Sequence, residues 1–137
     1  MVMKSLFPEE MYSSGASFTM EDVVSKLTYF QEQVHLMHWQ TQSFSEHKAL
    51  GDLYGYLESF RDEIVEKLSG YMGRKVRAYK LIPLIEGTIS NSIVTELGEW
   101  AYSLYEWAGS MHYCDVENKA QELSGKAYLT KYLLTLS

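Results

Sequence analysis

The chain of 137 residues has a single cysteine, Cys114, and only two prolines, Pro8 and Pro83. One cysteine excludes an internal disulfide framework and is typical of a reducing compartment. No apolar run reaches the roughly 18 residues that a membrane-spanning helix needs. The first twelve residues also lack the apolar stretch of a signal peptide. We therefore expect a soluble, cytoplasmic protein without a membrane partner.

Basic residues are also scarce, since 12 Lys and Arg stand against 18 Asp and Glu, for a formal net charge of −6. A dedicated nucleic-acid binder normally has a clustered basic face, and the basic cluster at residues 74–80 is short. The charge balance therefore argues against a nucleic-acid partner. Apolar residues make up 46% of the chain, and with so little proline this composition favours a helical domain over a turn-rich β-sandwich.

Apolar residues recur at three- and four-residue steps in four segments, which predicts four amphipathic helices. These helices are expected over about residues 19–40, 43–70, 92–111 and 115–134. Ser43 and Glu46 form a capping box for the second helix, and Asp115 is the expected cap of the fourth. Residues 1–16 show no such period and are expected to be an N-terminal arm of a single domain spanning 1–137.

The link between the second and third helices is longer than the usual two to eight residues of a helix bundle. A helix of about 22 residues is roughly 33 Å long. An extended link of about ten residues covers that length, so the middle link is long enough to cross from one end of the bundle to the other. The sequence therefore predicts an all-α, ferritin-like four-helix bundle with a long crossover between helices 2 and 3.

The second helix carries a polar stripe beside its apolar face, in which no Lys or Arg offsets three acids. The stripe follows helical steps of three and four residues through His47, Gly51, Gly55, Glu58, Asp62 and Glu66. Like charges four residues apart destabilise an isolated helix by about 0.2–0.5 kcal/mol a pair. Such a stripe favours a bound cation or a protein partner.

The stripe is self-complementary when the helix pairs antiparallel with a second copy of itself. His47 then faces Glu66, and Gly51 faces Asp62, because the two residue numbers of each pair sum to 113. An isologous, two-fold pair produces such reciprocity, and it creates two equivalent sites roughly 20–25 Å apart. His38 joins each site across the short turn before the second helix. Two imidazoles and two carboxylates suit Fe(II), with Zn(II) or Mn(II) as alternatives.

The run Met37-His38-Trp39-Gln40, followed by His47 and by an Asp-x-x-x-Glu fifteen residues later, resembles the signature of the Dps-like mini-ferritins. The resemblance implies a ferroxidase centre between two-fold-related subunits, with His38, His47, Asp62 and Glu66 as iron ligands. Those proteins usually have an acid four residues after the second histidine, where this chain has Gly51.

The function expected from the sequence is Fe(II) binding and oxidation at an intersubunit di-metal site of a homo-oligomer, with iron storage or detoxification as its purpose. Asp52 and Glu58 are auxiliary candidates for the same site. The alternative is a non-catalytic ferritin-like scaffold or interaction protein whose metal site is degenerate because of Gly51. Glu32 and His35 match a di-iron Glu-x-x-His motif, but the chain has no second copy of it.

Overall fold

The computed structural model describes residues 18–136, which form four helices and no strand. The helices are α1 (Met20–Gln40), α2 (Phe44–Met72), α3 (Ser90–Ser110) and α4 (Cys114–Leu134). The all-helical class and the four helices predicted from the sequence are therefore confirmed for this part of the chain. The predicted arm at residues 1–16 lies outside the described residues.

The caps of the first two helices follow the local sequence. At the start of α1, the backbone N–H of Asp22 donates to the Thr19 hydroxyl at 3.0 Å, and the Asp22 carboxylate accepts from the Thr19 N–H at 3.1 Å. At the start of α2, the Ser43 hydroxyl accepts from the Glu46 N–H. The Glu46 side chain does not complete the predicted box, because its carboxylate accepts instead from the Ser90 hydroxyl at 2.6 Å. That bond joins the start of α2 to the start of α3.

The prediction that Asp115 caps α4 is wrong. The helix begins at Cys114, with Tyr113 at the N-cap and no side-chain capping bond. Asp115 therefore lies in the first turn, where its backbone N–H donates to the Tyr71 hydroxyl at 3.2 Å. This contact ties the start of α4 to the end of α2, so a tertiary bond takes the place of the expected local cap.

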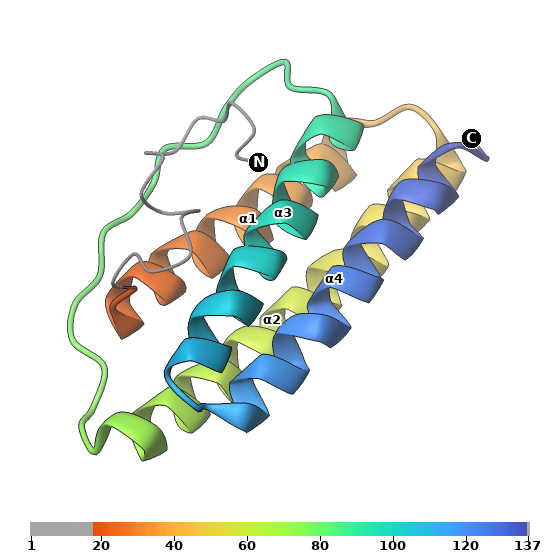
Figure 1. Cartoon of the computed structure of the whole chain (residues 1–137). Helices are drawn as coiled ribbons and strands as arrows, with labels where there is room; N and C mark the ends of the chain where they lie inside the picture. The colour runs from red at the N-terminus through yellow and green to blue at the C-terminus, as the bar shows by residue number, and fades with distance from the viewer. Residues whose placement is uncertain (1–17, 137) are drawn as a thin grey trace.

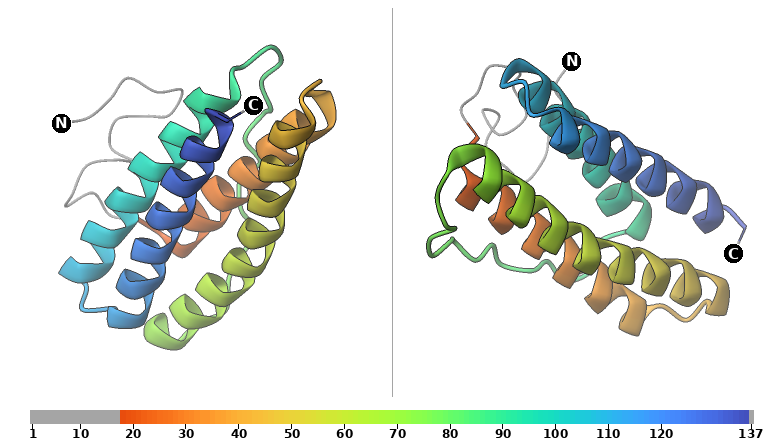
Figure 2. Two further views of the ribbon diagram at one scale, coloured as in Figure 1. Left: turned by 90° about the vertical axis from the view of Figure 1, so that its right-hand side faces the viewer. Right: turned by 90° about the horizontal axis from the view of Figure 1, so that it is seen from below.

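Each helix packs against two neighbours, since α1 contacts α2 and α3, while α4 contacts α2 and α3 (Figures 1 and 2). α1 and α4 run in one direction, and α2 and α3 run in the other (Figure 1). The core consists of buried apolar side chains from all four helices, the largest of which include Trp100, Phe30, Phe60, Met20 and Leu53. Full burial of one such aliphatic or Phe side chain contributes about 1.5–3 kcal/mol.

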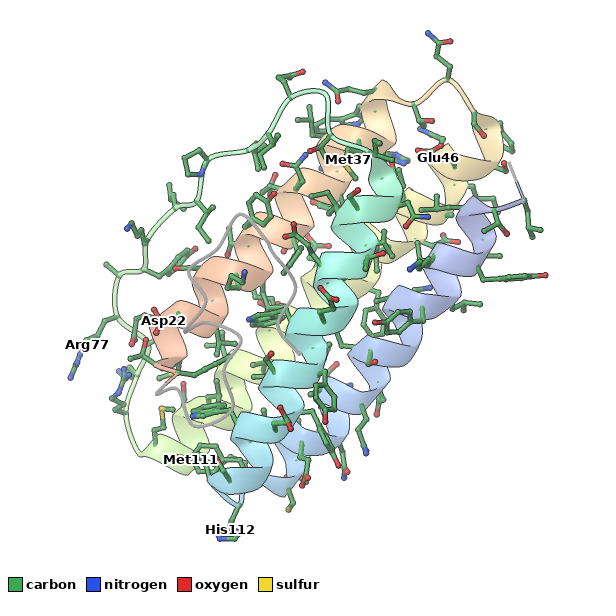
Figure 3. The ribbon with its side chains drawn as sticks, turned by 45° about the horizontal axis from the view of Figure 1, so that its top comes forward. Asp22, Met37, Glu46, Arg77, Met111 and His112 are labelled. Carbon is green, nitrogen blue, oxygen red and sulfur yellow. The ribbon has the colours of Figure 1, made fainter. Side chains whose placement is uncertain are left out.

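The connection from residue 73 to residue 89 runs along the side of α1 for the length of the bundle (Figure 1). Near its start, Arg74 donates to both carboxylate oxygens of Glu21 at 2.9 Å, and the Arg77 N–H donates to the same carboxylate at 2.8 Å. Figure 3 shows Asp22 and Arg77 at this end of α1, and Met37 and Glu46 at the other. These bonds thus fix the start of the connection to the first turn of α1.

Farther along, the connection is held by the buried side chain of Gln33. Its amide donates to the Ile85 carbonyl at 3.0 Å, and its oxygen accepts from the Ile85 N–H at 2.8 Å. Gln40 then donates to the Glu86 carboxylate at 3.2 Å. These contacts hold the connection against α1, and its first part also borders α2 beside Asp62 and Glu66.

The Glu21 contacts predict a specific acid sensitivity. Hydrogen bonding to Arg74 and to the Arg77 backbone lowers the pKa of Glu21 from about 4.5 to about 2. Its stabilising contribution is therefore complete above pH 4.5 and is lost as the pH falls through about 2. Urea unfolding at a series of pH values should show a smaller acid loss in Glu21→Gln than in the wild-type chain. The exposed carboxylate of Glu32 is the control, and an equal effect of Glu32→Gln would contradict this assignment.

Candidate metal-binding site

The predicted ligands His38 and His47 meet at the turn between α1 and α2. Their imidazole rings stack with centroids 3.8 Å apart and an interplanar angle of 17°. The Nδ1 atom of His38 lies 2.6 Å from the His47 carbonyl oxygen, and the Nδ1 atom of His47 lies 2.7 Å from the His38 carbonyl oxygen. Because a carbonyl oxygen only accepts, both Nδ1 atoms carry the proton and donate it.

This pairing determines what the other ring nitrogens can do. A neutral imidazole with a protonated Nδ1 has an unprotonated Nε2, whose lone pair is free to bind a metal ion. Histidine ligands in metal sites commonly donate their other N–H to a carbonyl or carboxylate, which fixes the tautomer and the ring orientation. The two bonds therefore fix the tautomer of each ring, so that Nε2 is the nitrogen of a neutral ring that a metal ion can bind.

The ring of His38 fills the space beside Gly51 in which a side chain at position 51 would lie. A Cβ atom at position 51 would lie 2.8 Å from His38 Cε1 and 3.1 Å from His38 Nδ1. Any side chain there must displace the ring, so the acid expected at this position is incompatible with the observed histidine pair. The packing of α1 against α2 at this turn therefore requires glycine at position 51.

The acids of the stripe lie farther along the same helix. Glu58, Asp62 and Glu66 are exposed, and within residues 18–136 none of them forms an ion pair. Asp62 and Glu66 line an open cavity of about 260 Å³ with Val24, Val65, Val76, Tyr79 and Arg61. The Arg61 guanidinium donates to the Thr28 hydroxyl at 3.0 Å.

The structure therefore brings the four predicted ligands together as two pairs and not as one cluster. His47 and Asp62 are fifteen residues apart on α2, which is about 22 Å along a helix axis. No group of three or more His, Cys, Asp or Glu is placed to hold a metal ion in the described part of the chain. A site with all four ligands needs a second copy of the chain.

His35 and Tyr54 add stacked rings beside the histidine pair, and the sequence did not reveal this packing. The ring of His35 stacks on Tyr54 from α2 with centroids 3.8 Å apart, and it lies 3.8 Å from the ring of Trp39. Its centroid is 5.9 Å from that of His38. The three- and four-residue spacing of His35, His38 and Trp39 could have indicated a shared face, but no local pattern indicates the contact with Tyr54.

One lysine in the core also escaped the sequence analysis. Lys26 on α1 is fully buried, with its Nζ 5.4 Å from the centroid of the Phe30 ring. Burial lowers the pKa of Lys26 to about 6, against the opposing effect of Glu96 on α3. Burial likewise raises the pKa of the Glu96 carboxyl. Lys26 lies three residues after Val23 and therefore on the apolar face of the helix. This spacing was the sequence signal that could have indicated its burial.

The close contact at Gly51 predicts opposite effects of two glycine substitutions. Gly51→Ala should displace His38 and break its bond to the His47 carbonyl, which costs about 1–3 kcal/mol of stability. Gly125→Ala, at an exposed position where a Cβ meets nothing within 4 Å, should instead gain about 0.5–1 kcal/mol. Urea unfolding measures the change in stability of each variant, and the ¹⁵N chemical shifts of the His38 ring report its displacement in Gly51→Ala. Equal stabilisation by the two substitutions would show that the His38 ring does not lie over Gly51.

None of the helices in the described residues is both long enough and apolar enough to span a membrane. A chain that is similar over most of its length is described as an uncharacterized 14.6 kDa protein in the mobD-ri intergenic region of Enterobacteria phage T4. It is 27% identical over 134 residues, which cover 90% of this chain and 93% of that protein. No solved structure matches the chain.

The resemblance to the Dps-like mini-ferritins is wrong at the level of the family, because the family profile that matches is a different one. The motif that carried the resemblance is short, and its two histidines serve within one chain to close the α1–α2 turn. The matching profile covers residues 38–134, which include the end of α1 and all of α2, α3 and α4. The chain therefore belongs to DUF5856, a family of unknown function.

Proposed function

We propose that two copies of this chain pair antiparallel through α2 and bind Fe(II) between them. His38 and His47 of one copy supply the nitrogen ligands, and the Asp62 and Glu66 positions of the other supply the carboxylates. The observation that carries the proposal is the reciprocal Nδ1–carbonyl bonding, since it leaves the Nε2 atom of each ring available as a ligand.

The acid stripe supports the pairing because Glu58, Asp62 and Glu66 form no ion pair within residues 18–136. An antiparallel second copy brings its histidine end over the acid end of the first. A metal cation bound between the two ends then neutralises the carboxylates, which otherwise repel one another along α2.

Gly55 supports the same geometry from the centre of the stripe. It is exposed in the middle of α2, and a Cβ added there meets nothing within 4 Å. Mid-helix glycine costs roughly 0.5–1 kcal/mol relative to alanine, and no contact among residues 18–136 requires it. A second helix backbone that approaches closely at this point accounts for the glycine.

The ligand set also suits the proposed chemistry. Imidazole nitrogens bind Fe(II), while carboxylate oxygens are hard ligands that favour Fe(III). In the oxidation, each Fe(II) loses one electron to dioxygen or peroxide, which is reduced to water with uptake of protons. The activity is ferroxidase-like and removes free Fe(II); Zn(II) and Mn(II) are the competing ions for the same ligands.

Subunit mixing tests the shared site directly. His47→Ala and Asp62→Ala should each abolish anaerobic Fe(II) uptake, as measured by native mass spectrometry. Refolding the two variants together should restore about a quarter of the wild-type uptake, because half of the pairs are mixed and each mixed pair has one complete site. Glu63→Ala is the control, since that carboxylate faces Lys119 on α4 at 3.2 Å, and it should bind as the wild-type chain does.

Two results would contradict the proposal. Mixed variants that bind no more iron than the separate variants would place all the ligands in one chain. A wild-type chain that forms pairs but takes up no Fe(II) would show that the pairing has no metal function.

A metal-free interaction protein is the second candidate function, and one observation favours it. No three ligand-type side chains of the described residues already form a cluster, and His38 occupies the place above Gly51 where another ligand would lie. In that case the α1–α2 face serves protein contact alone.

A further inference from the structure

We infer that Trp39 of each copy inserts into the cavity beside Asp62 and Glu66 of the other copy. This inference rests on the antiparallel pairing of the proposed function, and it names the contact that holds the pair together. The cavity and the indole lie at opposite ends of the same face, as a two-fold contact requires.

The cavity has apolar walls and a charged rim formed by Arg61, Asp62 and Glu66. Val24 of α1, Val65 of α2, and Val76 and Tyr79 of the connection form its walls. The side chains of Val76 and Tyr79 are 37% and 39% exposed, although both are apolar enough to favour burial. Within one chain this space of about 260 Å³ is open to solvent, so a ring from outside can enter it.

Trp39 has the chemistry that such a cavity accepts. Its side chain is 65% exposed at the end of α1, and the centroid of its ring lies 3.8 Å from that of His35. An indole combines a large apolar body with one N–H donor. The body fits the valine and tyrosine walls, and the N–H can donate to a carboxylate at the rim. Buried tryptophans of this kind often carry much of the free energy of an interface.

The register of the pair brings the two features together. The contacts of His38 with His47 place Trp39 level with residues 46–47 of α2. The two-fold relation that sets His47 opposite Glu66 then sets Trp39 opposite residues 66–67 of the other copy. A two-fold axis that crosses the face also lays α1 over α1, which puts the indole on the Val24 side, where the cavity lies.

Phe44 is a matched control for this inference. It is 80% exposed at the same end of the bundle, but the same relation sets it opposite residue 69, beyond the cavity walls. It also has no donor for the carboxylates of the rim. Its removal should therefore leave the pair intact.

Sedimentation equilibrium on the full chain tests the contact. Trp39→Ala should raise the dissociation constant of the pair about tenfold or more, and Val76→Trp should do the same by filling the cavity from its own side. The double variant should be no weaker than either single variant, because both remove one interaction. Phe44→Ala should change the dissociation constant less than about twofold.

Tryptophan fluorescence provides a second readout that does not depend on a substitution. Trp100 and Trp107 are buried within the chain, so Trp39 accounts for the solvent-exposed emission. That emission should shift to shorter wavelengths as the concentration rises and pairs form. Pairs that form with unchanged emission, or with an unchanged dissociation constant in Trp39→Ala, would overturn the inference.

Iron uptake separates this inference from the function on which it rests. Pairs that depend on Trp39 but bind no Fe(II) support the contact and contradict the metal site. Pairs that bind Fe(II) without dependence on Trp39 support the metal site and contradict the contact. A chain that stays monomeric at every concentration would overturn both.

Discussion

The reciprocal hydrogen bonds between His38 and His47 fix the face on which every functional argument depends. They close the α1–α2 turn, and they set the level of Trp39 relative to the start of α2. They also place the His38 ring over Gly51 and make Nε2 the nitrogen of each neutral ring that a metal ion can bind. These two bonds from imidazole rings to backbone carbonyls thus determine the register of α1 against α2 and the need for glycine at position 51. They also determine which ring nitrogens are available as ligands at this end of the two helices.

The helices were predictable because their signals are local. Apolar residues at helical spacing, the Thr19–Asp22 cap and the left-handed Gly73 at the end of α2 each act within a few residues. The start of α4 was not predictable, because α4 has no side-chain cap and the N–H of Asp115 in its first turn donates to Tyr71 from another helix. The path of the connection depends on Gln33 bonding to Ile85, residues 52 positions apart, which no local pattern encodes.

From the sequence, the site could be predicted only as a set of positions on helix faces. Helical period places Asp62 and Glu66 on the stripe with His47, and the structure leaves both acids exposed there. The tautomer of the histidines, the reason for Gly51 and the cavity near Tyr79 all depend on contacts between helices or with the connection. The family assignment failed for the same reason, since a few residues at helical spacing suit both a metal site and a closed turn.

The antiparallel pairing of α2 is the central claim, and a distance between two copies of one spin label tests it most directly. Gly70 is an exposed position one helical turn beyond Glu66, where an added side chain meets nothing within 4 Å in its own chain. A nitroxide attached to Gly70→Cys in a Cys114→Ser background therefore lies past the end of the segment from His47 to Glu66 that pairs. Antiparallel pairing about the stripe centre predicts a separation of about 40 Å along the helix axes. A separation below about 20 Å, which parallel helices at an interaxial distance of 8–10 Å would give, or no dipolar coupling at all, would contradict it.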